Sequence, residues 1–239
     1  ATKTDRSPLS WVPTAYLAEG IPFAMVIWVA GTLFKDLGHS DTEITVSTAS
    51  VGIMWSLKPL YAGFLDMFKT KRFWVIAMQL VMAALLALWA TSLALSNYFV
   101  VGILLLWLLA FASATQDICI DGVYITALDQ RSQGSFMGVQ GAFWNAGRIF
   151  ATAVVVGVAS YLQRQGMDAK GAWTLALAVS MGTMALLAAY HFYVLPVGSV
   201  PERPKNAAAV VGTFKDQFVD FLQKPHLLGM LAFVFLFRL

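Results

Sequence analysis

The chain of 239 residues contains 59% hydrophobic and only 12% charged residues, about half the charged share of an average soluble protein. A soluble domain of this length needs a polar surface that such a composition does not supply. The 16 Lys and Arg residues nearly balance the 13 Asp and Glu residues and are dispersed, which argues against nucleic-acid binding. Cys119 is the single cysteine, which excludes an internal disulfide. The composition therefore indicates an integral membrane protein.

Six segments reach the roughly 20 mainly apolar residues that a membrane-spanning helix requires. They are residues 10–34, 45–65, 73–95, 98–128, 136–162 and 172–195. Only Ser96 and Asn97 separate the third segment from the fourth, so these two are expected to form a tight helical hairpin. The pattern predicts an all-α integral membrane fold whose first domain, residues 1–195, is a bundle of six transmembrane helices.

The composition changes after residue 195. Residues 196–225 begin with three prolines within nine residues, Pro196, Pro201 and Pro204, and continue with aromatic residues at helical spacing among charged ones. This predicts a linker with an amphipathic helix that lies either on the membrane surface or against the protein. The apolar run in residues 226–239 is too short to span a bilayer. We therefore expect it to be the truncated start of a seventh transmembrane helix, with the missing C-terminal half of the same protein beyond it.

The distribution of Lys and Arg predicts the orientation, because these residues favour the cytoplasmic side of a membrane. With the N terminus inside, only Lys35, Arg164 and Lys170 fall on outer loops, and all others outside the predicted spans fall on cytoplasmic segments. The bias predicts a cytoplasmic N terminus and a cytoplasmic linker at residues 196–225.

Ionisable side chains inside a span cost at least about 2.5–3.5 kcal/mol each at the helix centre, so they are candidates for function. The apolar segments hold six at comparable estimated depth: Glu19, Lys58, Asp117, Asp121, Arg148 and Arg238. We expect them to surround a polar cavity, whereas fixed ion pairs that hold the bundle together are the alternative. Function is favoured for Asp117 and Asp121, and both interpretations stay open for Lys58.

Helical phasing groups further polar residues. One face of the fourth span carries Ser113, Asp117, Asp121 and Tyr124, and Gln116 borders this face. The fifth span carries a glycine stripe, Gly134, Gly138 and Gly141, which predicts the close approach of another helix. Asn145 and Arg148 continue that spacing and are expected to face the cavity, with an Arg148–Asp117 ion pair as the alternative.

Pro22 lies three residues after Glu19 in the first span. Because proline has no backbone N–H, the carbonyl of Ala18 is expected to lose its helical hydrogen bond. A locally broken helix beside a buried carboxylate is typical of solute and proton sites. Ordinary packing around a proline kink is the alternative.

The turn between the second and third spans combines Asp66 with the basic residues Lys69, Lys71 and Arg72. Asp66 is expected to be a structural charge at a helix end that faces these cations, whereas simple anchoring by basic residues on the cytoplasmic side is the alternative. His39 and His226 lie in loops and carry no functional signal in the sequence.

Several stretches resemble the AmpG-type muropeptide permeases of the major facilitator superfamily, which are related to acetyl-CoA transporters. Residues 115–121 are similar to the Ser/Thr-Gln-Asp-x-x-x-Asp core of that family. Further matches are Gly20, Pro22, Lys58, Pro59, Asp66, Gly138 and Arg148. The turn after the second span departs from the superfamily pattern, because Ala62 and Lys69 stand at positions where glycine is usual.

The resemblance implies a major-facilitator-type six-helix bundle that imports anhydro-muropeptides, which are peptidoglycan fragments, across the bacterial inner membrane. Import would be proton-coupled and proceed by alternating access, as in a secondary transporter. The resemblance also implies that the protein is not an enzyme, needs no cofactor or metal, and has protons, the lipid bilayer and a small glycan-peptide substrate as partners. Asp117, Asp121 and Glu19 are the candidates for proton coupling.

The expected substrate combines a carboxylate with many hydroxyl groups and sugar rings. Arg148 and Arg238 are expected to bind the carboxylate, because a guanidinium can donate two parallel hydrogen bonds to it. The other expected substrate contacts are Gln116, Asn145, Tyr124 and Trp144, of which Trp144 offers an apolar face to a sugar ring.

An intramembrane Mg²⁺-dependent transferase that uses the Asp117/Asp121 pair is the alternative function. Such an enzyme requires a second acidic motif, and only Asp129 is nearby. Neither Gly-x-Ser-x-Gly nor His-Glu-x-x-His occurs in the sequence. A regulatory or scaffold membrane protein is a third hypothesis, against which the ionisable residues on several spans argue.

Overall fold

The computed structural model describes residues 6–198, 212, 219, 223 and 225–237. This part of the chain is all-helical and contains no β-strand. Within it, five continuous helical segments are long and apolar enough to cross a membrane, namely Pro8–Asp36, Lys71–Ser92, Tyr98–Ala127, Gln130–Arg164 and Ala169–Val194. The chain is therefore that of an all-α, multi-pass membrane protein.

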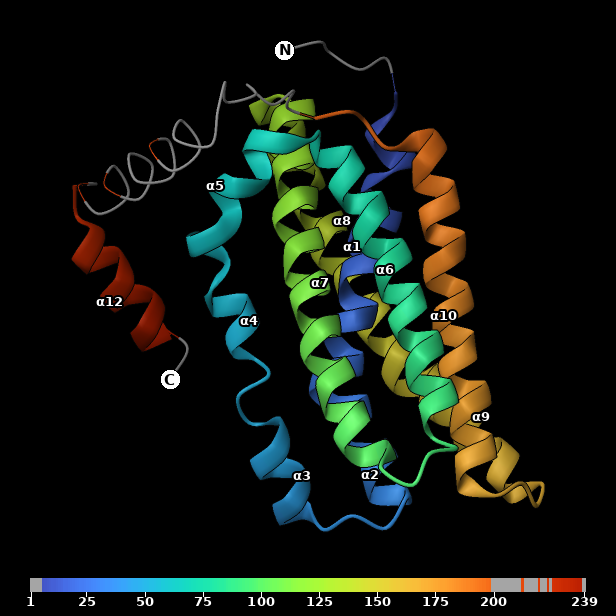
Figure 1. Cartoon of the computed structure of the whole chain (residues 1–239). Helices are drawn as coiled ribbons and strands as arrows, with labels where there is room; N and C mark the ends of the chain where they lie inside the picture. Colours follow the sequence, from blue (N-terminus) through green and yellow to red (C-terminus); the bar gives the residue numbers. More distant parts are fainter. Residues whose placement is uncertain (1–5, 199–211, 213–218, 220–222, 224, 238–239) are drawn as a thin grey trace.

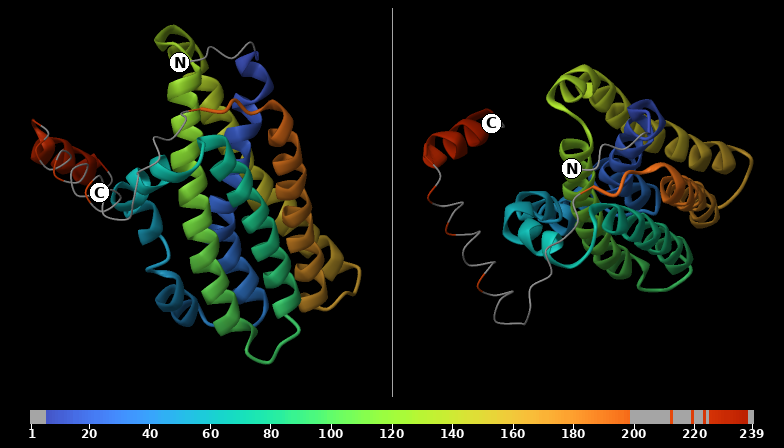
Figure 2. Two further views of the ribbon diagram at one scale, coloured as in Figure 1. Left: turned by 45° about the horizontal axis from the view of Figure 1, so that its top comes forward. Right: turned by 90° about the horizontal axis from the view of Figure 1, so that it is seen from above.

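The five segments run side by side with α1 (Val12–Ala24) in the middle of the bundle, as Figures 1 and 2 show. Helix α1 packs against α7 (Tyr98–Ala127), α8 (Gln130–Ile149) and α10 (Ala169–Val194), while α6 (Lys71–Ser92) packs against α7 and α10. Helices α6 and α7 form the predicted hairpin around Ser96 and Asn97. The central position of α1 places its polar residues within reach of several neighbours.

Two of the five segments contain a π-helical turn. Helix α1 continues through the turn Met25–Val29 into α2 (Ala30–Asp36), and α8 continues through Phe150–Val155 into α9 (Val156–Arg164). The two turns contact each other. Pro22 does not interrupt α1, so the expected break in the first span is reduced to the missing backbone hydrogen bond and the π-helical turn that follows.

The second predicted span, residues 45–65, is not a continuous helix. Its place is taken by three short helices, α3 (Asp41–Thr48), α4 (Ile53–Ser56) and α5 (Lys58–Phe68). Pro59 in the first turn of α5 has no N–H to offer the carbonyl of Trp55. Most of the residues from Thr45 to Val51 are polar or β-branched and favour helix only weakly. The expectation of one continuous second helix is corrected accordingly.

The closest helix crossing joins α1 to α8. A Cβ atom on Gly20 would lie 2.1 Å from the carbonyl oxygen of Trp144, and one on Gly147 would lie 2.4 Å from that of Leu17. By contrast, a Cβ atom on any glycine of the predicted stripe would meet nothing within 4 Å. The close contact expected of Gly134, Gly138 and Gly141 is thus made by Gly20 and Gly147.

A buried polar cluster links three helices of the bundle. The Nδ1 atom of His191 (α10) lies 2.9 Å from the side-chain amide nitrogen of Gln79 (α6). Its Nε2 atom lies 3.1 Å from the hydroxyl of Thr14 (α1). Because His191 and Gln79 are fully buried, these hydrogen bonds fix the relative positions of the three helices.

The C-terminal part contains α12 (Leu227–Phe237), an apolar helix of 11 residues that stands apart from the bundle in Figures 1 and 2. It begins where the truncated seventh helix was expected. Most of the expected linker and amphipathic helix, residues 196–225, lies outside the described residues.

Candidate functional site

A cavity of about 550 Å³ lies between α1, α4, α5, α7 and α8. Its lining residues are Glu19, Phe23, Ile27, Gly52, Trp55, Lys58, Asp117 and Trp144. The volume is within the range of about 300–1,000 Å³ that is usual for small-molecule sites. The lining combines two carboxylates and an ammonium group with aromatic rings. Of the six ionisable residues expected around a polar cavity, Glu19, Lys58 and Asp117 line it, whereas Asp121 and Arg148 do not.

An ion pair between Lys58 and Asp117 lies in the cavity wall. Lys58 is the first residue of α5 and directly follows the interruption between α4 and α5. Asp117 lies in the second half of the continuous helix α7. The ion pair therefore connects the broken second segment to the bundle, and Asp117 is not paired with Arg148.

Glu19 contributes a second carboxyl group to the cavity from α1. The residue is only 8% exposed, and its Oε2 atom has no hydrogen-bond partner among the described residues. A buried carboxyl oxygen in this situation is able to bind a proton or to accept a hydrogen bond from a ligand.

Asp121 lies one helical turn beyond Asp117 on α7. Its Oδ1 atom accepts a hydrogen bond of 2.9 Å from the hydroxyl of Tyr16. Tyr16 lies three residues before Glu19 on α1, and therefore on the same helical face. The three acidic groups thus follow the contact between α1 and α7, with Asp121 held by a phenol and Asp117 by an ammonium group.

Arg148 lies beside the cavity on α8. Its guanidinium carbon is 4.4 Å from the ring centre of Trp28 and 5.0 Å from that of Trp144. Its Nη1 atom donates a hydrogen bond of 3.1 Å to Oδ1 of Asn145. No carboxylate in the described part of the chain forms an ion pair with Arg148, and its Nε atom is buried without a partner there. The guanidinium is therefore positioned by neutral groups and has no acidic partner in the described part of the chain.

Four aromatic rings form the apolar side of the site. The ring of Phe23 packs edge-on against Trp55 at 5.1 Å and Trp28 at 5.6 Å, and it lies tilted at 5.3 Å from Trp144. Flat aromatic faces next to charged groups suit ligands that contain rings with polar substituents.

Two residues that the sequence placed in the substrate site lie elsewhere. Gln116 is fully buried, and its Nε2 atom donates a hydrogen bond of 3.0 Å to the carbonyl of Ala18. This is the carbonyl that Pro22 was predicted to leave without a helical partner. The hydroxyl of Tyr124 donates a hydrogen bond of 2.6 Å to the carbonyl of Gln133 near the α7–α8 turn. Both side chains hold helices together and do not line the cavity. Asn145 and Arg148, which were expected to face the cavity, lie beside it and are not among its lining residues.

Two other predicted residues are outside the described set: Arg238 entirely, and Asp66 in its side chain. Sequence reasoning missed Tyr16, Phe23, Trp28 and Trp55. A usable signal existed for three of them, because Tyr16 and Phe23 lie one turn from Glu19, and Trp55 lies three residues before Lys58.

No protein-family model matches the chain, and a search of curated proteins gives no significant match. In the described residues, no group of three or more His, Cys, Asp and Glu side chains is arranged to hold a metal ion.

Proposed function

We propose that the protein is a proton-coupled secondary transporter, and that the cavity beside α1 binds its substrate. The observation that carries the proposal is the combination, in one cavity of a membrane-spanning bundle, of the Lys58–Asp117 ion pair with the unpartnered carboxyl oxygen of Glu19. Charged groups at membrane depth are costly, so a cavity that gathers them is most readily explained by the passage of a polar solute.

A major-facilitator-type bundle with six crossings is the architecture that we propose. Arg6, ahead of α1, donates a hydrogen bond to the carbonyl of Tyr193 at the end of α10, so the chain enters and leaves the bundle at the same end. This arrangement supports an even number of crossings, and in the proposal the α3–α5 segment is the sixth beside the five continuous spans (Figure 1). In this proposal the N terminus is cytoplasmic in the bacterial inner membrane.

The proposed substrates are anhydro-muropeptides or related glycan-peptides. Arg148, held over two tryptophan rings, supplies the cation for a carboxylate, and the faces of Trp144 and Trp55 supply apolar surfaces for sugar rings. Asn145 positions Arg148. The alternative of a Mg²⁺-dependent transferase gains no specific support, because Asp117 is engaged by Lys58 and Asp121 by Tyr16.

Proton coupling predicts that Asp117→Asn and Asp121→Asn impair uptake against a gradient more than they impair folding. Each variant is expected to lower the accumulation of a radiolabelled anhydro-disaccharide in proteoliposomes by about tenfold or more, because an amide cannot carry the proton. Asp41→Asn, which removes an exposed carboxylate, is the matched control. Accumulation equal to that of the parent at every pH in both variants would refute the coupling role.

The anchoring role of Arg148 predicts a loss of affinity in Arg148→Lys. Lysine keeps the charge but cannot donate two parallel hydrogen bonds to a carboxylate, so the dissociation constant of the same disaccharide is expected to rise about tenfold. Binding is measured by calorimetry on detergent-solubilised protein whose thermal unfolding shows that it is folded. Arg131→Lys, at an exposed position of α8, is the control, and unchanged affinity in a folded Arg148→Lys protein would reject the role.

A further inference from the structure

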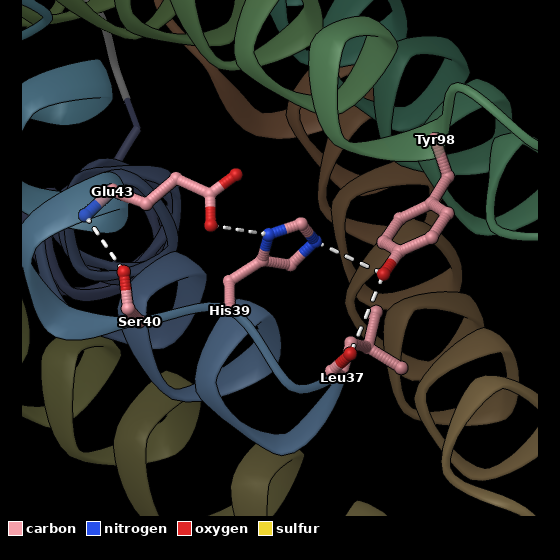
Figure 3. Close-up of polar contacts among 5 residues, drawn as sticks. All are labelled: Leu37, His39, Ser40, Glu43 and Tyr98. Atoms are coloured by element: carbon pink, nitrogen blue, oxygen red, sulfur yellow. Dashed lines mark hydrogen bonds and ion pairs between the residues drawn. The ribbon is translucent and has the colours of Figure 1, made fainter.

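A second cluster of polar side chains lies at the end of the bundle that is opposite to the N terminus. There the loop between α2 and α3 meets α7 (Figures 1 and 3). His39 is its centre. Two helix caps fix the backbone at this residue. The N–H of His39 donates to the carbonyl of Phe34 at 3.0 Å, which closes the end of α2 through Gly38 at φ +94°. The next residue, Ser40, caps α3 by accepting from the N–H of Glu43 at 3.2 Å.

Both ring nitrogens of His39 have partners, and the partners come from different helices. Nδ1 lies 3.0 Å from the carboxylate of Glu43 on α3, and Nε2 lies 3.0 Å from the hydroxyl of Tyr98 on α7. The imidazole also stacks on the ring of Phe99, with centres 4.1 Å apart and planes 22° apart. Figure 3 shows His39 between Glu43 and Tyr98. The histidine therefore bridges α3 and α7.

The cluster satisfies both protonation states of the imidazole. In the neutral state Nδ1–H donates to Glu43, and the Tyr98 hydroxyl donates to Nε2. When Nε2 gains a proton it donates to the Tyr98 oxygen, and the hydroxyl of Tyr98 turns to the carbonyl of Leu37, which is 3.4 Å away. Protonation also turns the hydrogen bond to the Glu43 carboxylate into an ion pair between two charged groups. The link between α3 and the rest of the cluster is thus stronger when His39 is charged.

The other charged groups around His39 nearly balance. Lys35 pairs with Asp41 at 2.6 Å. Asp36 accepts hydrogen bonds from Trp173 and Gln163. On the α10 side, the ammonium group of Lys170 lies 4.3 Å from the ring centre of Tyr98. Glu43 is therefore the carboxylate that responds directly to a proton on His39.

Helix α3 has few other attachments to the bundle. Ile44 is its single buried residue, whereas Val46 is 74% exposed. The chain continues from α3 into α4 and α5, which supply Trp55 and Lys58 to the cavity wall. The position of α3 therefore affects the segment that forms one side of the cavity.

We propose that His39 is a proton-binding site whose protonation fixes α3 against α7 and thereby restrains the α3–α5 segment at the cavity. The proton site stands on the geometry of the cluster, and its control of the cavity rests on the proposed transport function. In the proposed orientation, His39 faces the outside of the cell, which is the side from which a coupling proton enters.

The test uses a nitroxide spin label at Val46→Cys on protein reconstituted in phosphatidylcholine vesicles. The mobile fraction of the label is expected to be about twofold larger at about pH 7.5 than at about pH 5.5, the range in which histidines usually change charge. His39→Phe retains a ring for stacking on Phe99 but binds no proton, and Glu43→Gln removes the carboxylate. Both variants are expected to lose the pH response, whereas His226→Gln is expected to keep it.

A label that responds to pH equally in the parent and in folded His39→Phe overturns the proton site, as does a parent without a response. The pH profile of disaccharide uptake then tests whether protonation of His39 controls the cavity. If uptake is measurable and His39→Phe leaves its pH profile unchanged, control of the cavity by His39 is rejected. The spin label reports the mobility of α3 in the absence of substrate. A failure of the transport proposal therefore does not alter the result on the proton site.

Discussion

Gly20→Ala is expected to destabilise the bundle by about 3 kcal/mol or more, at the upper end of the usual costs of overpacking. The added Cβ atom would lie 2.1 Å from the carbonyl oxygen of Trp144. The obstacle is backbone rather than a flexible side chain, so the clash is relieved only by moving α1 away from α8. That movement also displaces Glu19 and Trp144, which line the cavity. Reversible unfolding in mixed micelles of increasing denaturing detergent measures the effect.

Gly138→Ala is the matched control for this substitution. Gly138 lies in helix α8, as Gly147 does, but a Cβ atom there would meet nothing within 4 Å. Alanine is the better helix former by about 1 kcal/mol, so the control is expected to be as stable as the parent or more so. A Gly20→Ala protein with unchanged stability would show that the helices do not cross as closely as described.

Lys58→Met is expected to cost about 3–5 kcal/mol, because it leaves the carboxylate of Asp117 buried without its counter-ion. The double variant Lys58→Met/Asp117→Leu removes both charges and is expected to recover most of that loss, since a well-packed apolar pair often replaces a buried ion pair without penalty. Both proteins are expected to lose proton-driven accumulation. The same unfolding assay, with uptake in proteoliposomes, separates stability from function.

Lys35→Met provides the comparison at an exposed pair. Lys35 and Asp41 have side chains that are 54% and 82% exposed, and such pairs contribute about 0–1 kcal/mol. If the double variant is no more stable than Lys58→Met, the ion pair does not explain the loss, and packing around the Lys58 side chain does.

The continuous spans were predictable because the bilayer thickness fixes the length of apolar helix that is needed, about 20 residues, whatever the helix packs against. The second span was not, because averaging over residues 45–65 conceals its interruption. Gly52 and Pro59 stand in an apolar context, and whether the helix breaks there depends on what its neighbours offer. Lys58 forms an ion pair with Asp117 on α7. This long-range contact helps to stabilise the interrupted helix of the second segment.

The carbonyl freed by Pro22 was predicted from local chemistry, and the donor that satisfies it was not. Proline removes a specific hydrogen bond, so the position of Ala18 follows from counting four residues back. The donor, Gln116, lies 98 residues away on α7. The sequence had offered it as a substrate ligand, because an amide side chain serves either purpose equally well.

Glu19, Lys58 and Asp117 could be chosen as site candidates from the sequence, because charged side chains are costly inside a membrane. The aromatic residues next to them could not be chosen in this way. The chain contains 8 Trp and 17 Phe residues, and most positions of this kind in a membrane protein face lipid or pack in the interior. The rotation of α1 relative to α8 decides that Trp28 and Trp144 flank Arg148. Helix rotation results from the Gly20–Gly147 contact, which involves two segments far apart in the sequence.

The contact of α1 with α8 also limits how the cavity is able to change shape. At Gly20 and Gly147 each backbone fills the notch that the missing Cβ atom leaves in the other. Sliding either helix along its axis would drive a side chain of the next turn into a main-chain carbonyl. Rotation about the contact point meets no such obstacle. Trp144 stands next to this point, whereas α4 and α5 supply Trp55 and Lys58 to another wall of the cavity, so a change in the shape of the cavity is expected to come mainly from α4 and α5.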